Sequence, residues 1–521
     1  MKGLQFLPQT PAKEASVNRV DVACFVGCVA FRGGPLPTAI IDWLQDRAWL
    51  NRDAAFPSAF HRPEAVELLD VPVLIDDWEM FNQLFVWERR PVAGDLTATT
   101  YLGTAVRAFF RQGGRRCYVI RVADPLPYRA ERVAREALLA RLLPGFPGVL
   151  QARESDRTSW HGIGHLFGLP DVSFVSVPDL ADLLKTSVED LSTDAIPSPG
   201  VEEQFVECSE PEPAPPKDNG LAEISAPTCD TDALNIWRDA VNRIGNFLVS
   251  QRREVTFVTS MPLASLDSDA AVDLQRFMRT HHWLVDNVVV NSQSLASAFV
   301  QLAYPWLLTD TSTELPQHLE PPEGMFLGLL AKNALLNGTF HSTVKVAPNN
   351  VIRLFPRFPS SQLYAVRRDL GVNERLVDHL SFFATTPQGI QLVSDVTTSS
   401  SLAYRNASVS RVVALVVRAA RLLGEDYVFE SSGETLWFRL QERLRNLLQS
   451  LYFLGALDGK NADEAFSVRC DRTTMTQQDI DSGRIIAELV MNPVTSIETI
   501  KVALELAPTG GASFTVVGME A

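Results

Sequence analysis

The sequence predicts a multidomain protein of mixed class, with a large α/β region followed by a smaller α+β region. Three observations support this prediction. The chain has 521 residues, which is enough for two to four domains. In the middle of the chain, amphipathic helices alternate with short apolar strands that end near a proline, as expected for an open α/β sheet. After residue 433, a helix with a leucine stripe is followed by several strand-like runs, as expected for an α+β unit.

The composition is that of an ordinary globular protein. Hydrophobic residues make up 46% of the chain and charged residues 21%, so a sizeable core can form. The net charge of -15 argues against general nucleic-acid binding, because an acidic surface repels phosphates. No apolar run is long enough for a transmembrane helix or a signal peptide, so we expect no membrane insertion. The six scattered cysteines predict folding in a reducing cytoplasm rather than a disulfide framework.

The first part of the chain predicts an α/β unit that follows a polar tail. Residues 1–20 contain Pro8 and Pro11 and predict an arm that becomes ordered only against a neighbour. The nearly continuous apolar run at 20–30 predicts a buried strand. After it we expect a helix at 101–111, a turn at Gly113-Gly114, a strand at 117–122, a helix at 131–143 and a strand at 172–177.

An acidic, proline-rich segment then interrupts this pattern. Residues 196–231 combine seven prolines with six glutamates, which predicts a flexible surface insertion. Beyond the insertion, the pattern predicts helices at 233–252, 269–279 and 324–337, and strands at 254–259 and 284–290.

The C-terminal region has its own helix and strand pattern. The helix that opens it carries apolar residues at steps of three and four, and a glycine turn ends it. Strand-like runs follow at 465–470, 485–491 and 497–506, and after Pro508 and Gly510-Gly511 a last strand is expected at 512–517. This last strand has no obvious partner in its own chain, so it is a candidate for pairing with another chain. The stripe of the helix comprises Leu436, Leu440, Leu444, Leu447, Leu448, Leu451 and Leu454.

The segment Gly455 to Lys460 has some likeness to a phosphate-binding loop. Its two glycines stand too close together, Asn461 replaces the hydroxyl residue that would hold magnesium, and it follows a helix rather than a strand. A turn at the C-terminus of a helix explains the segment better.

Two other residue pairs raise the question of metal or disulfide chemistry. His161 and His165 have the spacing of zinc ligands on a helix, but the glycines between them disfavour a helix. Cys24 and Cys28 would lie about 13 Å apart along a strand, which is too far for a disulfide. We therefore expect no catalytic residue, no metal site and no cofactor.

A basic helix is expected at 409–423. Valines and alanines form its apolar face, while Arg411 and Arg418 share another face and Arg421 lies nearby. Two interpretations stay open, namely a solvated basic face and a docking surface for an acidic partner.

The order of motifs along the chain resembles that of the sheath proteins of contractile phage tails and phage-tail-like injection systems. Each motif is short, but the ordered series covers about 500 residues. It includes residues 22–35, 78–81, 101–110, 113–114 and 117–122, then 177–179, 304–306, 321–322, 328, 389–390, 404–406 and 411, and finally 437, 453–457, 466–468, 470–471, 479–484 and 493.

This resemblance implies a domain organisation. It implies a multidomain sheath subunit with a linking arm at 1–20, an outer α/β region at 21–380, an inner α+β domain at 381–508 that faces a tube, and a linking strand at 509–521. The acidic insertion at 196–231 would be a surface decoration of the outer region.

The resemblance also implies a function and partners. Copies of the chain would form a homo-oligomer of stacked hexameric rings around an inner tube protein, with baseplate and terminal cap proteins at the ends. The sheath would assemble in the cytoplasm of the producing bacterium, as part of a phage tail or injection particle, and contract to drive the tube through a target membrane. Such a subunit is no enzyme.

Specific residues follow from the same resemblance. The inter-subunit strand would use Ala512, Phe514, Thr515, Val516 and Val517, and the candidates for facing the tube are Arg405, Arg411 and Arg418. Two alternatives stay open at this point, a static tube or shell protein and a soluble α/β enzyme with an unrecognised site.

Overall fold

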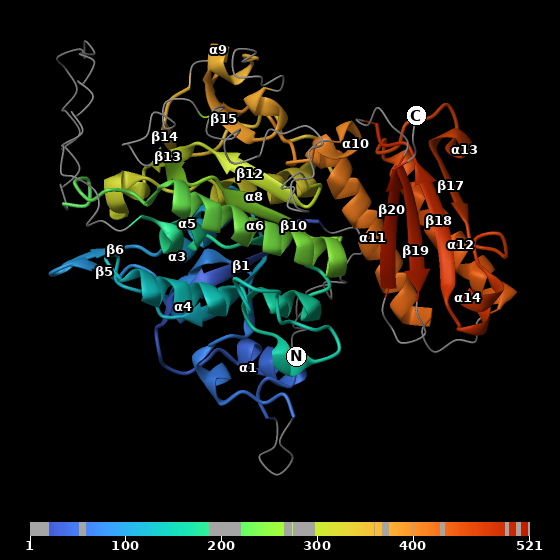
Figure 1. Cartoon of the computed structure of the whole chain (residues 1–521), viewed down its shortest axis with the longest axis horizontal. Helices are drawn as coiled ribbons and strands as arrows, with labels where there is room; N and C mark the ends of the chain where they lie inside the picture. The colour runs from blue at the N-terminus through green and yellow to red at the C-terminus, as the bar shows by residue number, and fades with distance from the viewer. Residues whose placement is uncertain are drawn as a thin grey trace, which may run out of the picture. The chain divides into compact units, whose positions relative to one another are not determined.

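A computed structural model gives the fold of most of the chain (Figure 1). It describes residues 20–51, 59–186, 220–264, 274, 297–358, 360–366, 375–399, 401–427, 433–494, 500–506 and 512–518. The described residues form two compact units, which meet in the sequence between Ser410 and Arg411. We expected this boundary at residue 381, and that expectation was wrong. Residues 381–392 form two strands that belong to the sheet of the larger unit.

The larger unit is built on an eight-stranded mixed sheet with the order β16-β15-β12-β10-β8-β1-β7-β3. The six inner strands are parallel, and the edge strands β16 and β3 are antiparallel to their neighbours. The strands are β1 (Ala23–Cys28), β3 (Pro72–Ile75), β7 (Cys117–Ala123), β8 (Phe174–Ser176), β10 (Thr256–Ser260), β12 (Val300–Tyr304), β15 (Ser381–Thr386) and β16 (Gly389–Leu392).

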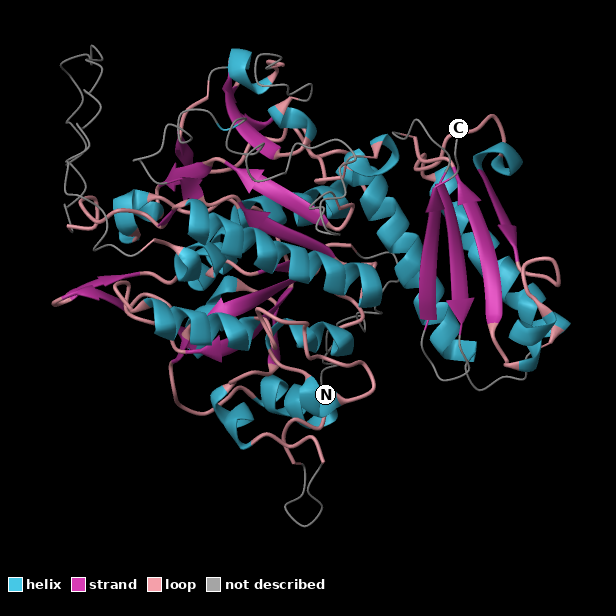
Figure 2. Cartoon of the chain, in the orientation of Figure 1, coloured by secondary structure: helices cyan, strands magenta, loops and turns pink. Residues whose placement is uncertain are grey.

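Two groups of helices flank this sheet (Figure 2). The first group contains α3 (Tyr101–Arg111) and α8 (Glu323–Leu336), and the second contains α4 (Arg132–Leu142), α5 (Leu180–Leu184) and α6 (Thr231–Gln251). Both groups contact the parallel strands, as expected for a sheet that is buried on both faces. Accordingly, all six residues of β1 are buried.

The close approach of α3 and α8 depends on glycine. A Cβ atom at Gly324 would lie 2.4 Å from the carbonyl oxygen of Ala105, and one at Gly328 would lie 2.5 Å from that of Phe109. The small residues predicted for the helix at 324–337 therefore let two backbones meet, which a larger side chain would prevent.

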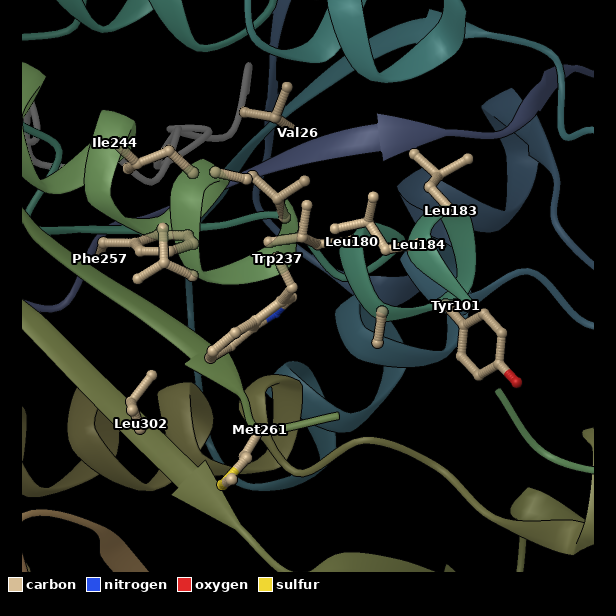
Figure 3. Close-up of a cluster of buried hydrophobic side chains, with 14 of the residues drawn as sticks. Val26, Tyr101, Leu180, Leu183, Leu184, Trp237, Ile244, Phe257, Met261 and Leu302 are labelled. Atoms are coloured by element: carbon tan, nitrogen blue, oxygen red, sulfur yellow. The ribbon is translucent and has the colours of Figure 1, made fainter. Parts of the chain in front are cut away.

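The second helix group packs over the main core (Figure 3). Trp237 of α6 is fully buried in the same cluster as Leu180 and Leu184 of α5, Val26 of β1 and Phe257 of β10. Burial of an apolar side chain of this size contributes on the order of 1.5–3 kcal/mol. The core thus joins strands and helices that lie more than two hundred residues apart.

Smaller elements complete the larger unit. Its two-stranded sheets are β2 (Ala30–Phe31) with β4 (Phe85–Val86), β5 (Arg90–Ala93) with β6 (Leu96–Ala98), β9 (Thr228–Cys229) with β11 (Leu263–Ala264), and β13 (Trp306–Thr309) with β14 (Val351–Phe355). Its short helices are α1 (Thr38–Asp46), α2 (Trp78–Leu84), α9 (Ser360–Leu363) and α10 (Leu402–Arg405), and the 3₁₀ helices include η1 (Pro63–Glu67), η2 (Arg157–Ser159) and η3 (Gly162–Gly168).

The smaller unit has the predicted α+β pattern. Its four-stranded antiparallel sheet has the order β17-β18-β19-β20 (Figure 1). The strands are β17 (Phe466–Arg469), β18 (Ile485–Met491), β19 (Ile500–Leu506) and β20 (Ala512–Gly518). The helices are α12 (Glu434–Phe453), α13 (Ala462–Ala465), α14 (Gln477–Asp481) and most of α11 (Ala407–Tyr427).

Most predicted elements are present within a few residues of their predicted bounds. The helix at 101–111 is α3, the helix at 131–143 is α4, and the helix at 324–337 is α8. The insertion is shorter than predicted, because β9 and the start of α6 fall within 196–231. Apart from Leu274, the predicted helix at 269–279 and strand at 284–290 lie outside the described residues, as do most of the insertion and the arm before Val20. No helix of the described residues is long and apolar enough to cross a membrane.

Candidate functional site

The sheet of the smaller unit ends in the strand that the sequence analysis singled out. β20 pairs with β19 along its whole length, from Ala512 opposite Leu506 to Gly518 opposite Ile500. We expected this strand to lack a partner in its own chain, and that expectation was wrong. β19 is antiparallel and of equal length, so it offers β20 a complete set of main-chain partners.

The sheet nevertheless has an open side at β20. Among the described residues, β19 is the one strand that pairs with β20, so the second side of β20 is a sheet edge. The five predicted linking residues Ala512, Phe514, Thr515, Val516 and Val517 all lie in this edge strand. An edge of seven residues without proline is a template for a further strand, because its N–H and C=O groups are unpaired on one side.

A hydrophobic layer supports the sheet from one side. Along β18, buried residues alternate with half-buried ones, and along β17 buried Phe466 and Val468 alternate with exposed residues. The helix α12 contacts β17 and buries one stripe, which includes Leu440, Leu444 and Leu448. This packing fixes the sheet from its inner face and leaves the edge unaffected, because hydrogen bonds at an edge lie in the plane of the sheet.

The basic helix differs from the prediction. In α11, every residue from Ala407 to Arg421 is buried, including the arginines. Arg411 is 3% exposed and Arg418 is 2% exposed, so these two side chains do not form an open basic face. Arg405, at the end of α10, is half-buried. The periodicity identified the apolar face correctly, but it did not show that the opposite face is also covered.

The crevice where open α/β sheets usually bind ligands is closed. Such a crevice lies at the carboxyl ends of the strands, where the strand order reverses, which in this sheet is between β1 and β8. Cys28 ends β1 and Asp179 follows β8, and the cavity that they line with Arg90 and Asp182 has a volume of only about 10 Å³. A substrate has no room there.

Buried charges fill this crevice, and they satisfy one another. Asp182 binds Arg90 at 2.6 Å and Lys185 at 2.8 Å, and all three side chains are nearly inaccessible. Burial alone would raise the pKa of Asp182, but the two cations lower it to about 2. Asp179 accepts the Cys28 N–H at 2.7 Å, and burial raises the pKa of its carboxyl group to about 7. We call Arg90, Asp179, Asp182 and Lys185 the buried ion network.

The cysteines near this network are inert. Cys24 and Cys28 are buried and free, and burial raises the pKa of both thiols well above the ordinary value. A thiolate is the reactive form of cysteine, so neither side chain is a nucleophile at neutral pH.

The two histidines of the predicted zinc spacing share a carboxylate instead. The imidazole of His165 lies with Nε2 3.2 Å from Asp70, and Nδ1 of His161 also contacts Asp70. No group of three metal-ligating side chains occurs in the described part of the chain. The sequence did not reveal Asp70, because it lies about ninety residues earlier, in a left-handed backbone conformation that aspartate tolerates.

The segment from Gly455 to Lys460 is the helix end that the sequence predicted. Gly455 has a φ of 80°, and the N–H of Ala456 donates to the carbonyl oxygen of Leu451 across the end of α12. This arrangement caps the helix, and it explains the glycine without any phosphate.

Comparisons with known proteins agree with this architecture. No protein-family model and no curated protein matches the chain. Among solved structures, a chain of the contracted baseplate of the anti-feeding prophage (AFP) matches with a TM-score of 0.56 and 17% identity, over 95% of this chain and 94% of that chain. The contracted helical sheath of AFP matches with a TM-score of 0.52 and 17% identity, over 95% of both chains.

A further structure belongs to a different particle. The contracted sheath complex of PVC, an extracellular contractile injection system, matches with a TM-score of 0.50 and 15% identity, over 91% of this chain and 88% of that chain. These matches span both units rather than one shared domain. The chain therefore has the fold of a contractile tail sheath protein.

Proposed function

We propose that the chain is the structural subunit of a contractile sheath, which polymerises as stacked hexameric rings around an inner tube. The observation that carries this proposal is the fold match over 95% of both chains, because it includes the edge-stranded sheet as well as the large α/β unit. Baseplate and cap proteins would lie at the two ends of the polymer. The particle would assemble in the cytoplasm of the producing cell and drive the tube through a target membrane.

The edge strand supports a specific mode of assembly. Main-chain hydrogen bonds join strands almost regardless of which chain supplies them, so a pairing of the β19–β20 type can also form between subunits. In the polymer, β20 of one subunit would pair with β19 of a neighbour. Such links can persist while rigid units rotate and slide during contraction.

The contact with the tube is a separate part of the proposal. Of the three predicted arginines, Arg405 is partly exposed, so it is the first candidate for the contact with the tube. Arg411 and Arg418 would reach a partner only if α11 became uncovered. Exposed ion pairs contribute about 0–1 kcal/mol each, which suits contacts that must break when the sheath contracts.

The closed crevice supports a structural role over the enzymatic alternative. The buried ion network occupies the place where a doubly wound sheet would bind a substrate. The energy for contraction would instead be stored in the packing of subunits, without a nucleotide site.

Electron microscopy of the purified full-length chain tests the proposal. We expect hollow tubes with a cogwheel cross-section, alone or with a co-expressed tube protein. Discrete particles under all assembly conditions would contradict the sheath function, and straight tubes of one fixed diameter would favour the static shell.

A further inference from the structure

An open cavity lies in the larger unit, away from the edge strand and the closed crevice. Its volume is about 610 Å³, which is within the range of small-molecule sites. It is lined by the start of η1, by the C-terminal part of α4 and by the residue before η3, together with Val122 of β7. The polar residues that line it are His61, Arg62, Glu64, Asp70, Arg141, Gln151 and His161.

The deepest acceptor in this cavity is already saturated. Asp70 accepts hydrogen bonds from Arg62 Nη1 at 2.8 Å, from the Gly162 N–H at 2.9 Å and from the two histidines. Burial would raise the pKa of Asp70, but the hydrogen bonds from His161 and His165 hold it well below the ordinary value. The carboxylate is therefore charged and fully engaged, and it has no acceptor capacity left for a cationic ligand.

Several hydrogen-bond donors that line the cavity, in contrast, remain available for a ligand. Arg141 is exposed and makes no hydrogen bond or ion pair with the described residues. His61 lines the cavity, and its Nδ1 is inaccessible to solvent and has no hydrogen-bond partner, so Nε2 is the nitrogen of this ring that a ligand can reach. His161 binds Asp70 through Nδ1, which leaves its second ring nitrogen without an assigned bond. Glu64 at the exposed rim is the one lining acid that does not bind a histidine or arginine among the described residues.

The wall behind Arg62 is also rich in positive charge. The guanidinium groups of Arg62 and Arg157 lie 4.8 Å and 4.0 Å from the ring of Trp49. Burial, together with the neighbouring positive charges of Arg47 and Arg62, lowers the pKa of Arg157 to about 10. No described carboxylate pairs with Arg47 or Arg157, so this region favours an anion.

We propose that this cavity binds a small molecule with a phosphate-type oxyanion, held by the guanidinium group of Arg141 and the imidazole rings of His61 and His161. A guanidinium group presents its N–H donors in a planar fork that matches an oxyanion, and charge-assisted hydrogen bonds of this kind are strong. A bound anion would join three segments that are far apart in the sequence. It would therefore stabilise the larger unit, whether or not the chain forms a sheath.

Titration of the full-length chain with inorganic pyrophosphate, at constant ionic strength, tests this proposal. We expect saturable heat of binding with a millimolar or lower Kd and a rise in Tm. Arg141→Gln should weaken binding at least about tenfold, the loss expected when one charged contact is removed. His61→Gln should weaken it less, because the charged guanidinium group of Arg141 and the imidazole ring of His161 both remain. Arg129→Gln removes an exposed arginine outside the cavity and is the matched control.

Three results would overturn the proposal. The first is the absence of saturable binding to the wild-type chain. The second is an equal loss of affinity in Arg141→Gln and Arg129→Gln, which would indicate general charge screening. The third is citrate binding as tightly as pyrophosphate, which would show a carboxylate site, such as one for an acidic segment of a partner protein. Circular dichroism of each variant verifies that it is folded, so lost binding cannot be confused with unfolding.

Discussion

The two sheets of this protein differ at one of their edges. The eight-stranded sheet ends in β16 and β3, which have four residues each, and β3 begins with Pro72. Short edge strands and proline are devices that prevent a further strand from adding. The four-stranded sheet also has a short edge strand, β17, with four residues, but its other edge strand is β20, which has seven residues and contains no proline. The edges of the larger unit's sheet therefore disfavour the addition of a further strand, whereas the β20 edge of the smaller unit favours it.

The two units also differ in how completely their polar groups are paired. In the larger unit, the buried ion network closes the crevice of the sheet, and its groups satisfy one another. In the smaller unit, the backbone groups on one side of β20 have no partner strand among the described residues. If this comparison is right, changes in the first region should affect stability, and changes in the second should affect polymerisation.

Removal of the edge strand should have the largest effect. Deletion of residues 510–521 should abolish polymerisation, because it removes β20 and its linker. The larger unit has its own core, so thermal unfolding should still show its transition. Sedimentation and electron microscopy measure the polymer, and a polymer unaffected by the deletion would refute the strand link.

Disruption of the buried ion network should have the next largest effect. Asp182→Asn leaves Arg90 and Lys185 buried without their counter-charge, and loss of one partner from such a group costs about 3–5 kcal/mol. Denaturant unfolding measures this loss. Asp232→Asn, at an exposed position in the first turn of α6, is the control and should change little. If Asp182→Asn lowers the free energy of unfolding by less than 1 kcal/mol, about the value of a surface ion pair, the charges of the network are not shielded from solvent.

A pH-dependent effect, about 1.4 kcal/mol for each pH unit, is expected at Glu323. This residue is buried, and burial raises the pKa of its carboxyl group from 4.5 to about 8. The folded state therefore holds a proton that the unfolded state loses above pH 4.5, so the wild type loses stability as the pH rises from 5 to 8. Glu323→Gln removes this loss. Its stability relative to the wild type should rise by about 1.4 kcal/mol per pH unit in that window. A constant difference from pH 5 to pH 8 would contradict this assignment.

The smallest effect is expected at Arg405. Arg405→Ala should weaken the association with the tube by about 0–1 kcal/mol per subunit, because a partly exposed ion pair is weak. Co-sedimentation of sheath and tube at increasing salt measures this change, with Arg129→Ala as the control. Identical salt dependence of co-sedimentation for the two variants would show that Arg405 is not part of the contact with the tube.

The elements that the sequence predicted are those encoded by neighbouring residues. The helix at 101–111 is an example, because the Thr100 side chain accepts the Gly103 N–H at 3.1 Å and caps it locally. The glycine turn after α12 is another. In both cases, the residues that decide the structure lie within one or two turns of one another.

The features that the sequence did not predict depend on distant residues. Pairing of β20 requires the register of β19, and the burial of Arg411 and Arg418 requires whatever covers the second face of α11. The boundary at residue 410 follows from β15 pairing with β12, about eighty residues earlier. The contact of Asp70 with His161 and His165 forms only in the folded chain, so the sequence pattern did not show it.

Disulfide cross-linking between β19 and β20 shows directly whether β20 is exchanged between subunits. Val502 and Val516 lie opposite each other in the pairing of β19 with β20, so the double variant Val502→Cys and Val516→Cys can form a disulfide across this pair. We expect that oxidation of the monomer gives a link within one chain, whereas oxidation of the polymer gives ladders of covalently joined chains. Links within single chains alone, in a polymer that has formed normally, would contradict the exchange of β20 between subunits.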